Sequence, residues 1–366
     1  MEAGLPAEPS RVGVGIVGLG NISGTYLRNL TTRFADVIEI IGCTDMDSGR
    51  IRAASEQYGV RGFADLNSMF DDSRVELIVN LTNPLAHAAV SEAAVAEGRH
   101  VYSEKPLTVD LADALTLLSR AEAAGVLVGC APDTFLGDGL QTCRRLVDSG
   151  EIGSPVAATA FMVCHGHENW HPAPAFFYQH GAGPMLDMGP YYLTAMVSLM
   201  GPISRVSGFE RITFPTRTIS SQPMAGRVID VEVPTHVAGL LEFTAGPIAT
   251  LVTTFDVWSA QVPHLEIYGT TGSLSAPDPN TFGGPVLLRH AADASWRPVA
   301  VVGDALDDSR GLGVADLARA IRTGGQPRAS GTMACHVLEA MHGIHLSATT
   351  GRAYSMQTTC SIPAAR

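Results

Sequence analysis

The feature that most constrains the fold is a glycine-rich turn near the N-terminus, Gly18-Leu19-Gly20-Asn21-Ile22-Ser23. A β-branched apolar run at 12–17 precedes this turn, and a stretch of helical character at 23–34 follows it. In that context the first glycine permits a tight turn, the second lets a pyrophosphate approach the backbone, and amides at the helix start attract anions. The sequence therefore predicts a dinucleotide site with contacts at Gly18, Gly20, Asn21 and Ile22.

Apolar runs and amphipathic stretches alternate up to about residue 131. Further strands are expected at 38–44, 77–81, 100–102 and 126–129, and helices at 50–58, 86–97 and 111–124. Because strands that alternate with helices connect as βαβ units, this half is predicted to form a parallel, doubly wound Rossmann sheet.

The pattern changes after about residue 131, where extended runs follow one another directly. They lie at 156–164, 206–213, 235–243, 248–255, 264–268, 272–275 and 286–290. Successive strands with alternating polar and apolar residues predict a large open, mainly antiparallel sheet. Helices expected at 185–199, 312–323 and 332–350 would cover one face of it.

The chain is thus predicted to be an α/β protein with two domains, since 366 residues exceed what one core usually organises. We expect a Rossmann domain at 11–131 and an α+β domain for substrate binding and oligomerisation at 132–366. Residues 1–10 have neither a basic region nor an apolar stretch, so they are expected to be a disordered tail and not a signal peptide.

Composition excludes several classes of function. The net charge of −12 and the lack of any run of Lys or Arg argue against a nucleic-acid partner, which needs a clustered basic face. No segment is apolar for long enough to span a membrane. The six cysteines have no paired spacing, which favours reduced, buried thiols and a cytoplasmic protein.

Other candidate cofactor contacts follow the second and third expected strands. Asp45 stands at the tip of 38–44, where a carboxylate accepts hydrogen bonds from ribose hydroxyls and repels a 2′-phosphate, so NAD is favoured over NADP. Thr82, Asn83 and Pro84 follow the next strand and are expected to flank the nicotinamide ribose. His87, on the helix after them, is either a further contact or a residue satisfied locally, and no catalytic role is expected of it.

Several stretches resemble the Gfo/Idh/MocA family, whose members include glucose-fructose oxidoreductase and inositol dehydrogenase. They are 18–23, 82–84 with His87, 104–106, 150–153 and 181–191, so the resemblance covers nearly the whole chain. It implies a Rossmann domain, an open antiparallel α/β domain, and NAD(P) between them with a sugar or polyol in front of the nicotinamide. It also implies that Glu104 and Lys105 lie at the cofactor and that Lys105 contacts the reacting hydroxyl or the nicotinamide ribose.

Lys105 is the first candidate catalytic residue. It follows a strand and precedes Pro106, a placement that holds it at the carboxyl edge of the sheet. A cationic nicotinamide nearby would disfavour the ammonium form and make the lysine a base or proton relay. The alternative is a surface lysine in an ordinary turn.

Asp187 and Tyr191 are the other candidates, four residues apart on an expected helix and therefore on one face of it. In the family this face looks into the substrate pocket, and histidine is more usual where this chain has Tyr191. Either Tyr191 takes the substrate proton with Lys105 as relay, or Lys105 is the base and Tyr191 orients the substrate. Asp187 is expected to bind a neighbouring hydroxyl. The alternative is that Asp187 caps the helix and Tyr191 is a buried aromatic residue, with no role in catalysis.

The segment 164–172 is dense in polar and aromatic residues. Carbohydrate sites combine hydrogen-bonding groups with an apolar ring that stacks on the sugar. The candidate substrate residues here are His165, His167, Trp170 and His171. Three histidines at this spacing match no common zinc pattern, so no metal is expected.

The sequence therefore predicts an NAD-dependent dehydrogenase that oxidises a secondary hydroxyl of a sugar, glycoside or polyol, with C3 as the candidate carbon. Three alternatives stay open: a glycoside hydrolase or lyase that recycles bound NAD, a reductase of ketones or imines, and a sugar or NAD sensor without turnover. A homodimer or homotetramer formed through the second sheet is implied by the family resemblance.

Overall fold

A computed structural model describes residues 11–366, and the tail expected at 1–10 lies outside the described residues. The chain divides into two compact units. The first contains the described residues up to Leu107, with Ala112–Asp133 and Arg310–Gly331, and the second contains Thr108–Leu111, Thr134–Ser309 and Thr332–Arg366. The main change of unit, after Asp133, lies close to the boundary expected after residue 131, but the return of 310–331 to the first unit was not expected.

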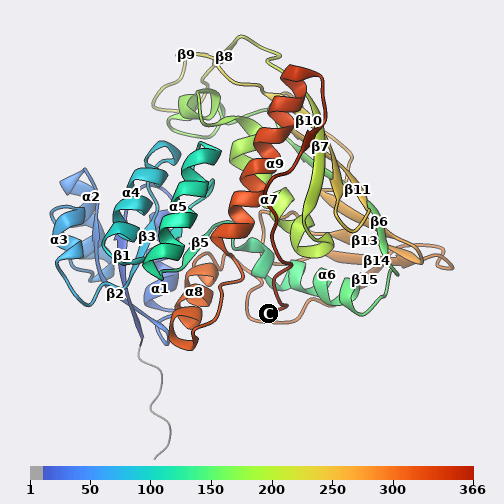
Figure 1. Ribbon diagram of the computed structural model, residues 1–366. Helices are drawn as coiled ribbons and strands as arrows, with labels where there is room; N and C mark the ends of the chain where they lie inside the picture. The colour runs from blue at the N-terminus through green and yellow to red at the C-terminus, as the bar shows by residue number, and fades with distance from the viewer. Residues whose placement is uncertain (1–10) are drawn as a thin grey trace, which may run out of the picture. The chain divides into compact units, whose positions relative to one another are not determined.

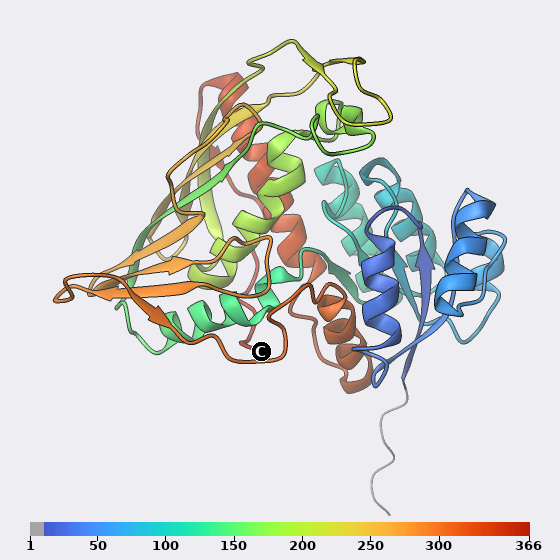
Figure 2. The ribbon, with the colours of Figure 1, turned by 180° about the vertical axis from the view of Figure 1, so that it is seen from behind.

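The first unit is built on a five-stranded sheet in the order β2-β1-β3-β4-β5, with every pair parallel. Its strands are β1 (Val12–Val17), β2 (Ile38–Thr44), β3 (Leu77–Asn80), β4 (His100–Ser103) and β5 (Val128–Cys130). Its helices are α1 (Ser23–Thr31), α2 (Ser48–Tyr58), α3 (Leu66–Phe70), α4 (Pro84–Ala96) and α5 (Leu111–Ala124). Figures 1 and 2 show α4 and α5 on one face of this sheet and α1 on the other, which confirms the predicted doubly wound arrangement.

Helix α8 (Leu312–Thr323) packs on β1, β4 and β5 of the first unit, so the prediction that it covers the antiparallel sheet is wrong. The buried carboxylate of Asp133 accepts hydrogen bonds from the amides of Gly311 at 2.9 Å and Gly313 at 3.0 Å, directly before and inside the helix. Burial raises the pKa of Asp133 to about 6. Beyond the helix, the Cys130 amide donates to the carbonyl of Ala329, so the edge of β5 is paired as well.

The second unit is built on a nine-stranded sheet in the order β15-β14-β13-β12-β6-β11-β10-β7-β16. Its strands are β6 (Pro155–Val163), β7 (Ile203–Arg211), β10 (His236–Phe243), β11 (Ile248–Thr254), β12 (Leu265–Gly269), β13 (Gly272–Ala276), β14 (Val286–His290), β15 (Arg297–Val299) and β16 (Tyr354–Ser355). Only the described pair of β6 and β11 is parallel, which confirms the mainly antiparallel prediction.

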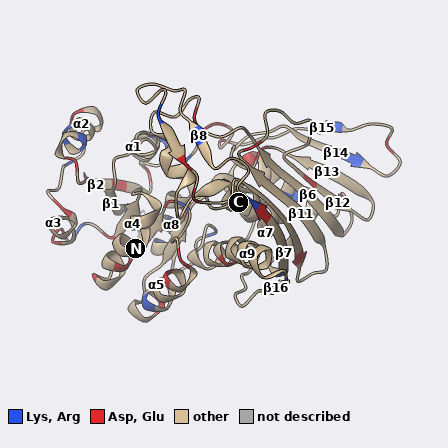
Figure 3. Cartoon of the chain, turned by 90° about the horizontal axis from the view of Figure 1, so that it is seen from above, with Lys and Arg blue, Asp and Glu red and all other residues tan. Residues whose placement is uncertain are grey.

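Helices cover one face of this sheet, as Figure 3 shows for α7 (Gly183–Met200) and α9 (Gly331–Thr350). Two glycines allow α9 to approach closely. A Cβ atom at Gly208 would lie 2.6 Å from Ile344 Cγ2, and one at Gly239 would lie 3.0 Å from Ile344 Cδ1. Helix α6 (Asp138–Asp148) packs on β13 and β14, and two 3₁₀ turns, η1 (Thr134–Leu136) and η2 (Pro174–Tyr178), complete the layer.

The opposite face of the sheet carries exposed apolar side chains. Phe209 on β7 is 82% exposed, and Leu240 on β10 is 55% exposed. Ile248 on β11 is exposed too, and no helix of residues 11–366 covers these strands from that side in Figure 3. Large apolar side chains exposed on one face of a sheet are typical of a surface that contacts another protein.

Residues 212–235 leave the sheet between β7 and β10, which pair directly with each other. They form a two-stranded sheet of β8 (Thr216–Thr218) and β9 (Val228–Asp230), which we call the β8–β9 excursion. Strand β9 lies beside η2, as both Figure 1 and Figure 2 show. Within residues 11–366, no helix combines the length and apolar character that crossing a membrane requires.

Candidate active site

The glycine turn after β1 leaves space where a dinucleotide pyrophosphate would bind. Gly18 has a φ of +94°, and a Cβ atom there would lie 2.7 Å from the Leu81 carbonyl carbon and the Thr82 amide nitrogen. By contrast, no atom lies within 4 Å of a Cβ built on Gly20. Helix α1 then begins at Ser23 without a side-chain cap. The close approach at Gly18, the open space at Gly20 and the uncapped helix start fit the phosphates of NAD.

Asp45 is held beside this turn at the end of β2. Its Oδ2 accepts a hydrogen bond from the Leu19 amide at 2.6 Å, and its Oδ1 accepts one from the Asp47 amide at 2.9 Å. The Arg50 guanidinium is 3.9 Å from Oδ2. Each carboxylate oxygen keeps a second lone pair, so the side chain is fixed in place and still able to accept a ribose hydroxyl.

The loop after β3 is organised by buried polar side chains. Asn80 Oδ1 accepts a hydrogen bond from the Thr82 hydroxyl at 2.7 Å, and Asn80 Nδ2 donates to the His87 carbonyl at 3.1 Å. The buried His87 ring places Nδ1 2.6 Å from the Pro106 carbonyl oxygen and Nε2 3.1 Å from the Thr82 carbonyl oxygen. Burial lowers the pKa of His87. The ring thus joins the two loops at which cofactor contacts are predicted.

Lys105 is half-buried at the carboxyl end of β4, in a cis peptide with Pro106. The Glu104 carboxylate accepts hydrogen bonds from the Tyr26 hydroxyl at 2.8 Å and from the Lys105 amide at 3.0 Å. These bonds fix the backbone that carries the lysine. The sequence holds a signal that motif reading missed: of 24 Lys and Arg residues, Lys105 is the only lysine. An amine can release its proton near neutral pH when its surroundings favour this, whereas a guanidinium stays charged.

In the second unit, Asp187 and Tyr191 lie on α7 as predicted, with Asp187 half-buried and Tyr191 buried. The His167 imidazole approaches the same helix, because its Nε2 is 3.7 Å from Asp187 Oδ2. That separation is too long for a direct hydrogen bond, yet a single oxygen atom can lie within hydrogen-bond distance of both atoms. The structure therefore brings together two of the predicted site residues from separate parts of the chain.

Aromatic rings fix the orientation of His167. Its ring stacks on Phe177 with centroids 3.7 Å apart and an angle of 7° between the planes, and it meets Phe255 edge-on at 4.7 Å. Trp170 is 62% exposed, with its ring centroid 5.3 Å from that of His167. This places one accessible indole beside the polar pair.

The other two predicted histidines have different surroundings. His165 stacks on Trp258 at 3.3 Å and meets Phe214 edge-on, so its ring contacts differ from those of His167. His171 Nδ1 accepts a hydrogen bond from the Ala173 amide at 3.1 Å, and burial lowers its pKa. In the described part of the chain, no group of three His, Cys, Asp or Glu side chains is placed to hold a metal ion.

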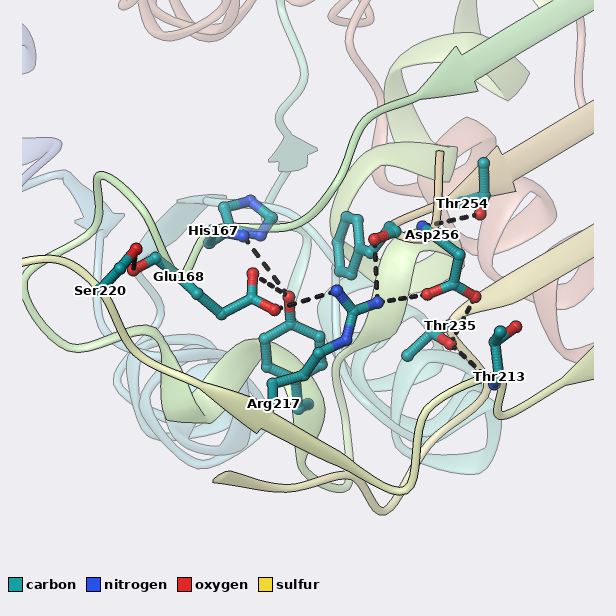
Figure 4. Close-up of polar contacts among 10 residues, drawn as sticks. His167, Glu168, Thr213, Arg217, Ser220, Thr235, Thr254 and Asp256 are labelled. Carbon is teal, nitrogen blue, oxygen red and sulfur yellow. Dashed lines mark hydrogen bonds and ion pairs between the residues drawn. The ribbon is translucent and has the colours of Figure 1, made fainter. Parts of the chain in front are cut away.

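A polar cluster beside residues 164–172 is not evident from the sequence. Arg217, on β8, contacts Glu168 and Asp256, and all three side chains are largely buried (Figure 4). A single arginine in a short alternating stretch carries no signal that distinguishes it from an exposed residue. Its partners come from distant parts of the sequence, so only the fold reveals them.

Comparison with known proteins agrees with this architecture. Residues 12–131 match the model of an oxidoreductase family with an NAD-binding Rossmann fold, and residues 140–275 match the Gfo/Idh/MocA C-terminal domain. Inositol 2-dehydrogenase 3 of Saccharopolyspora erythraea is 30% identical over 296 residues, which are 78% of this chain and 80% of that protein. The chain belongs to the Gfo/Idh/MocA oxidoreductase family, and its first unit is an NAD-binding Rossmann domain.

Other relatives match shorter regions. Inositol 2-dehydrogenase of Salmonella typhimurium is 30% identical over 166 residues. These residues are 44% of this chain and 47% of that protein, so the chain spans about half the length of this relative. Levoglucosan dehydrogenase, solved with NADH and levoglucosan, superposes with a TM-score of 0.82 at 17% identity and covers 95% of this chain and 100% of its own. An NAD-binding oxidoreductase from Klebsiella pneumoniae superposes with a TM-score of 0.81 at 19% identity, and the match covers 94% of this chain and 98% of that protein. At this identity, the two structures establish the fold.

Proposed function

We propose that this chain is an NAD-dependent dehydrogenase that oxidises a secondary hydroxyl of a sugar or polyol. The observation that carries the proposal is the pairing of His167 with Asp187 at 3.7 Å beside the exposed ring of Trp170, in a chain that also has an NAD-binding domain. Relatives named inositol 2-dehydrogenase and D-xylose dehydrogenase support a polyol or sugar as the substrate.

In the proposed reaction, bound NAD accepts a hydride from the carbinol carbon. The Lys105 amine takes the hydroxyl proton, either directly or from Tyr191, and Asp187 binds a hydroxyl next to the reacting one. His167 donates to or accepts from the same hydroxyl as Asp187, and Trp170 stacks on the C–H face of the ring. His165 and His171 remain candidate outer contacts of the substrate.

A substrate panel with added NAD tests the proposal. Purified protein should reduce NAD with at least one of myo-inositol, D-xylose or a glucoside, measured by nicotinamide absorbance. A glucoside that carries deuterium at C3 should transfer it to the cofactor if C3 is the oxidised carbon. Release of an aglycone without net NADH would instead identify a glycoside-cleaving enzyme, and a protein that binds NAD and turns over no member of the panel would contradict the proposal.

Asp45 is proposed to select NAD by accepting the adenosine ribose hydroxyls. Replacing Asp45 with serine should raise the KM for NAD about tenfold, because losing one hydrogen bond to a charged group costs about 1.5 kcal/mol. Because Arg50 lies 3.9 Å from this carboxylate, the KM for NADP should fall in the same variant.

Asp47→Ser is the matched control for this experiment. Asp47 caps α2 by accepting a hydrogen bond from the Gly49 amide at 2.8 Å, so the control changes a nearby carboxylate with a structural role. Equal KM values for NAD in wild type and Asp45→Ser would remove Asp45 from the cofactor site.

The open face of the nine-stranded sheet is proposed to join two or four copies of the chain. Phe209→Glu with Leu240→Glu should convert the assembly to monomers in sedimentation equilibrium, because burying two carboxylates at an apolar contact is unfavourable. Leu115→Glu, at an exposed leucine of α5, should leave the mass unchanged. A wild-type protein that sediments as a monomer would rule the contact out.

A further inference from the structure

We propose that Arg217 is a positioning residue that anchors the segment 164–171, called the substrate loop below, and so holds His167 beside Asp187. The inference rests on the proposed function in one respect, that the substrate loop binds the sugar or polyol. Its structural part, the anchoring of the loop by Arg217, stands on contacts within the second unit alone.

The Arg217 side chain projects from β8 into a buried position where it is only 5% exposed. Figure 4 shows its guanidinium between two carboxylates. Nη1 donates to Glu168 Oε1 at 3.0 Å, and Nη2 donates to the Phe255 carbonyl at 2.9 Å and to the Asp256 carboxylate. One arginine thereby joins the β8–β9 excursion to the substrate loop and to the end of β11.

The remaining oxygens of both carboxylates are also hydrogen-bonded. Glu168 Oε2 accepts from the Tyr178 hydroxyl at 2.7 Å, and Asp256 Oδ2 accepts from the Thr235 hydroxyl at 2.8 Å. The main-chain carbonyl of Glu168 accepts from the amides of Ser220 and Ser221, both at 2.9 Å. Glu168 is therefore held through both its side chain and its backbone by the excursion.

The same segments hold His167, the residue before Glu168. Its amide donates to the Tyr178 hydroxyl at 3.4 Å, and its ring lies against Phe177 and Phe255, the chain neighbours of Tyr178 and Asp256. Farther along the loop, the Ser221 hydroxyl donates to the His171 carbonyl at 2.5 Å. Displacing Glu168 would therefore displace the imidazole that faces Asp187.

A guanidinium suits this position better than an ammonium. It presents a planar fork of donors that reaches two carboxylates and a carbonyl at once, whereas the Lys ammonium is a compact point charge. Lysine would keep the positive charge but leave part of the cluster without a charged donor, and a buried carboxylate that loses its charged partner recruits water or moves. Arg217→Lys is thus a mild change that tests the geometry of the anchor rather than its charge.

The test compares the full-length Arg217→Lys variant with wild type and with Arg297→Lys. Arg297 lies on β15 of the same unit in an exposed ion pair with Glu151, so its replacement controls for the loss of a guanidinium. Amide hydrogen exchange of residues 164–171 should become about tenfold faster in Arg217→Lys, because the loop opens more readily. The control should match wild type.

Kinetics give the second readout. With myo-inositol as the substrate, or D-xylose if only the latter turns over, Arg217→Lys should raise the substrate KM about tenfold and leave the KM for NAD unchanged, because the cofactor domain is a separate unit. Loss of stability alone would lower the amount of folded enzyme, and with it the apparent kcat, but would leave both KM values unchanged. Loss of positioning raises the substrate KM. Tyr178→Phe, which removes one hydroxyl of the cluster, should act in the same direction with a smaller effect.

The outcomes separate this inference from the proposed function. Unchanged exchange of residues 164–171 in Arg217→Lys overturns the anchor, whatever the enzyme oxidises. Faster exchange in a protein that turns over no sugar or polyol supports the anchor and contradicts the proposed function. If Arg217→Lys does not fold, the same two measurements on Tyr178→Phe decide the question.

Discussion

Replacing Lys105 with alanine is expected to lower kcat for the polyol substrate about a thousandfold, the middle of the range for a lost general acid or base. The amine is proposed to take the hydroxyl proton, and no other lysine exists in the chain to replace it. NAD should still bind, because the glycine turn and Asp45 remain intact. Stopped-flow measurement of NADH formation, with NAD affinity from fluorescence titration, checks both parts.

The solitary lysine also permits an experiment that does not depend on turnover. Reductive methylation of the intact protein modifies one lysine side chain, Lys105, and the terminal amine. Saturating NAD should slow methylation of Lys105 in peptide mass spectra if the residue borders the cofactor, and Lys105→Arg should abolish the signal. Equal labelling with and without NAD, together with full activity of Lys105→Ala, would remove this residue from the mechanism.

Asp187→Asn is expected to lower kcat/KM for the substrate about a hundredfold, since it removes a charged acceptor that hydrogen-bonds a substrate hydroxyl more strongly in the transition state. The amide keeps the shape of the side chain, and the stacking of His167 on Phe177 should persist. Steady-state kinetics with the substrate identified by the panel, at saturating NAD, provide the measurement.

Asp148→Asn serves as the control, because Asp148 is an aspartate of the same unit that pairs with Arg144 on the surface of α6. Tyr191→Phe separates the two proposed proton routes. A large fall in kcat would favour the phenol as the immediate acceptor, whereas a small fall would favour the amine. An Asp187→Asn enzyme with wild-type kcat/KM would show that α7 does not contribute its carboxylate to the reaction.

The sequence was sufficient to predict both sheets and all of their strands except β15 and β16. The fully buried strand β1 consists of apolar residues and glycine, and three of the four residues of β3 are apolar, as expected of a sheet covered on both faces. In β6 and β10 burial alternates along the strand, as expected of a sheet with one covered face. The glycine turn and the acid after β2 were recognisable because their roles depend on local geometry. Such features need no knowledge of distant contacts.

Long-range placement was not predictable in the same way. The amphipathic pattern of α8 indicates a helix, but it does not indicate which sheet the helix covers. Its position is set by the hydrogen bonds of Asp133 to Gly311 and Gly313 and by the bond between the Cys130 amide and the Ala329 carbonyl. Arg217 meets Glu168 and Asp256 across 49 and 39 residues of sequence. Hydrogen bonds between residues so far apart in the sequence produce no periodic pattern of polar and apolar residues.

The return of residues 310–331 to the Rossmann unit has a practical consequence for dissecting the protein. A fragment cut after Asp133 would lose α8 and the strand-like contact of Ala329 with Cys130, leaving an unpaired sheet edge and an uncovered apolar surface, both of which promote aggregation. A minimal nucleotide-binding fragment of this chain must therefore join residues 11–133 to residues 310–331. A chimaera that exchanges only the first third of the sequence would lack the α8 side chains that complete the core of this unit.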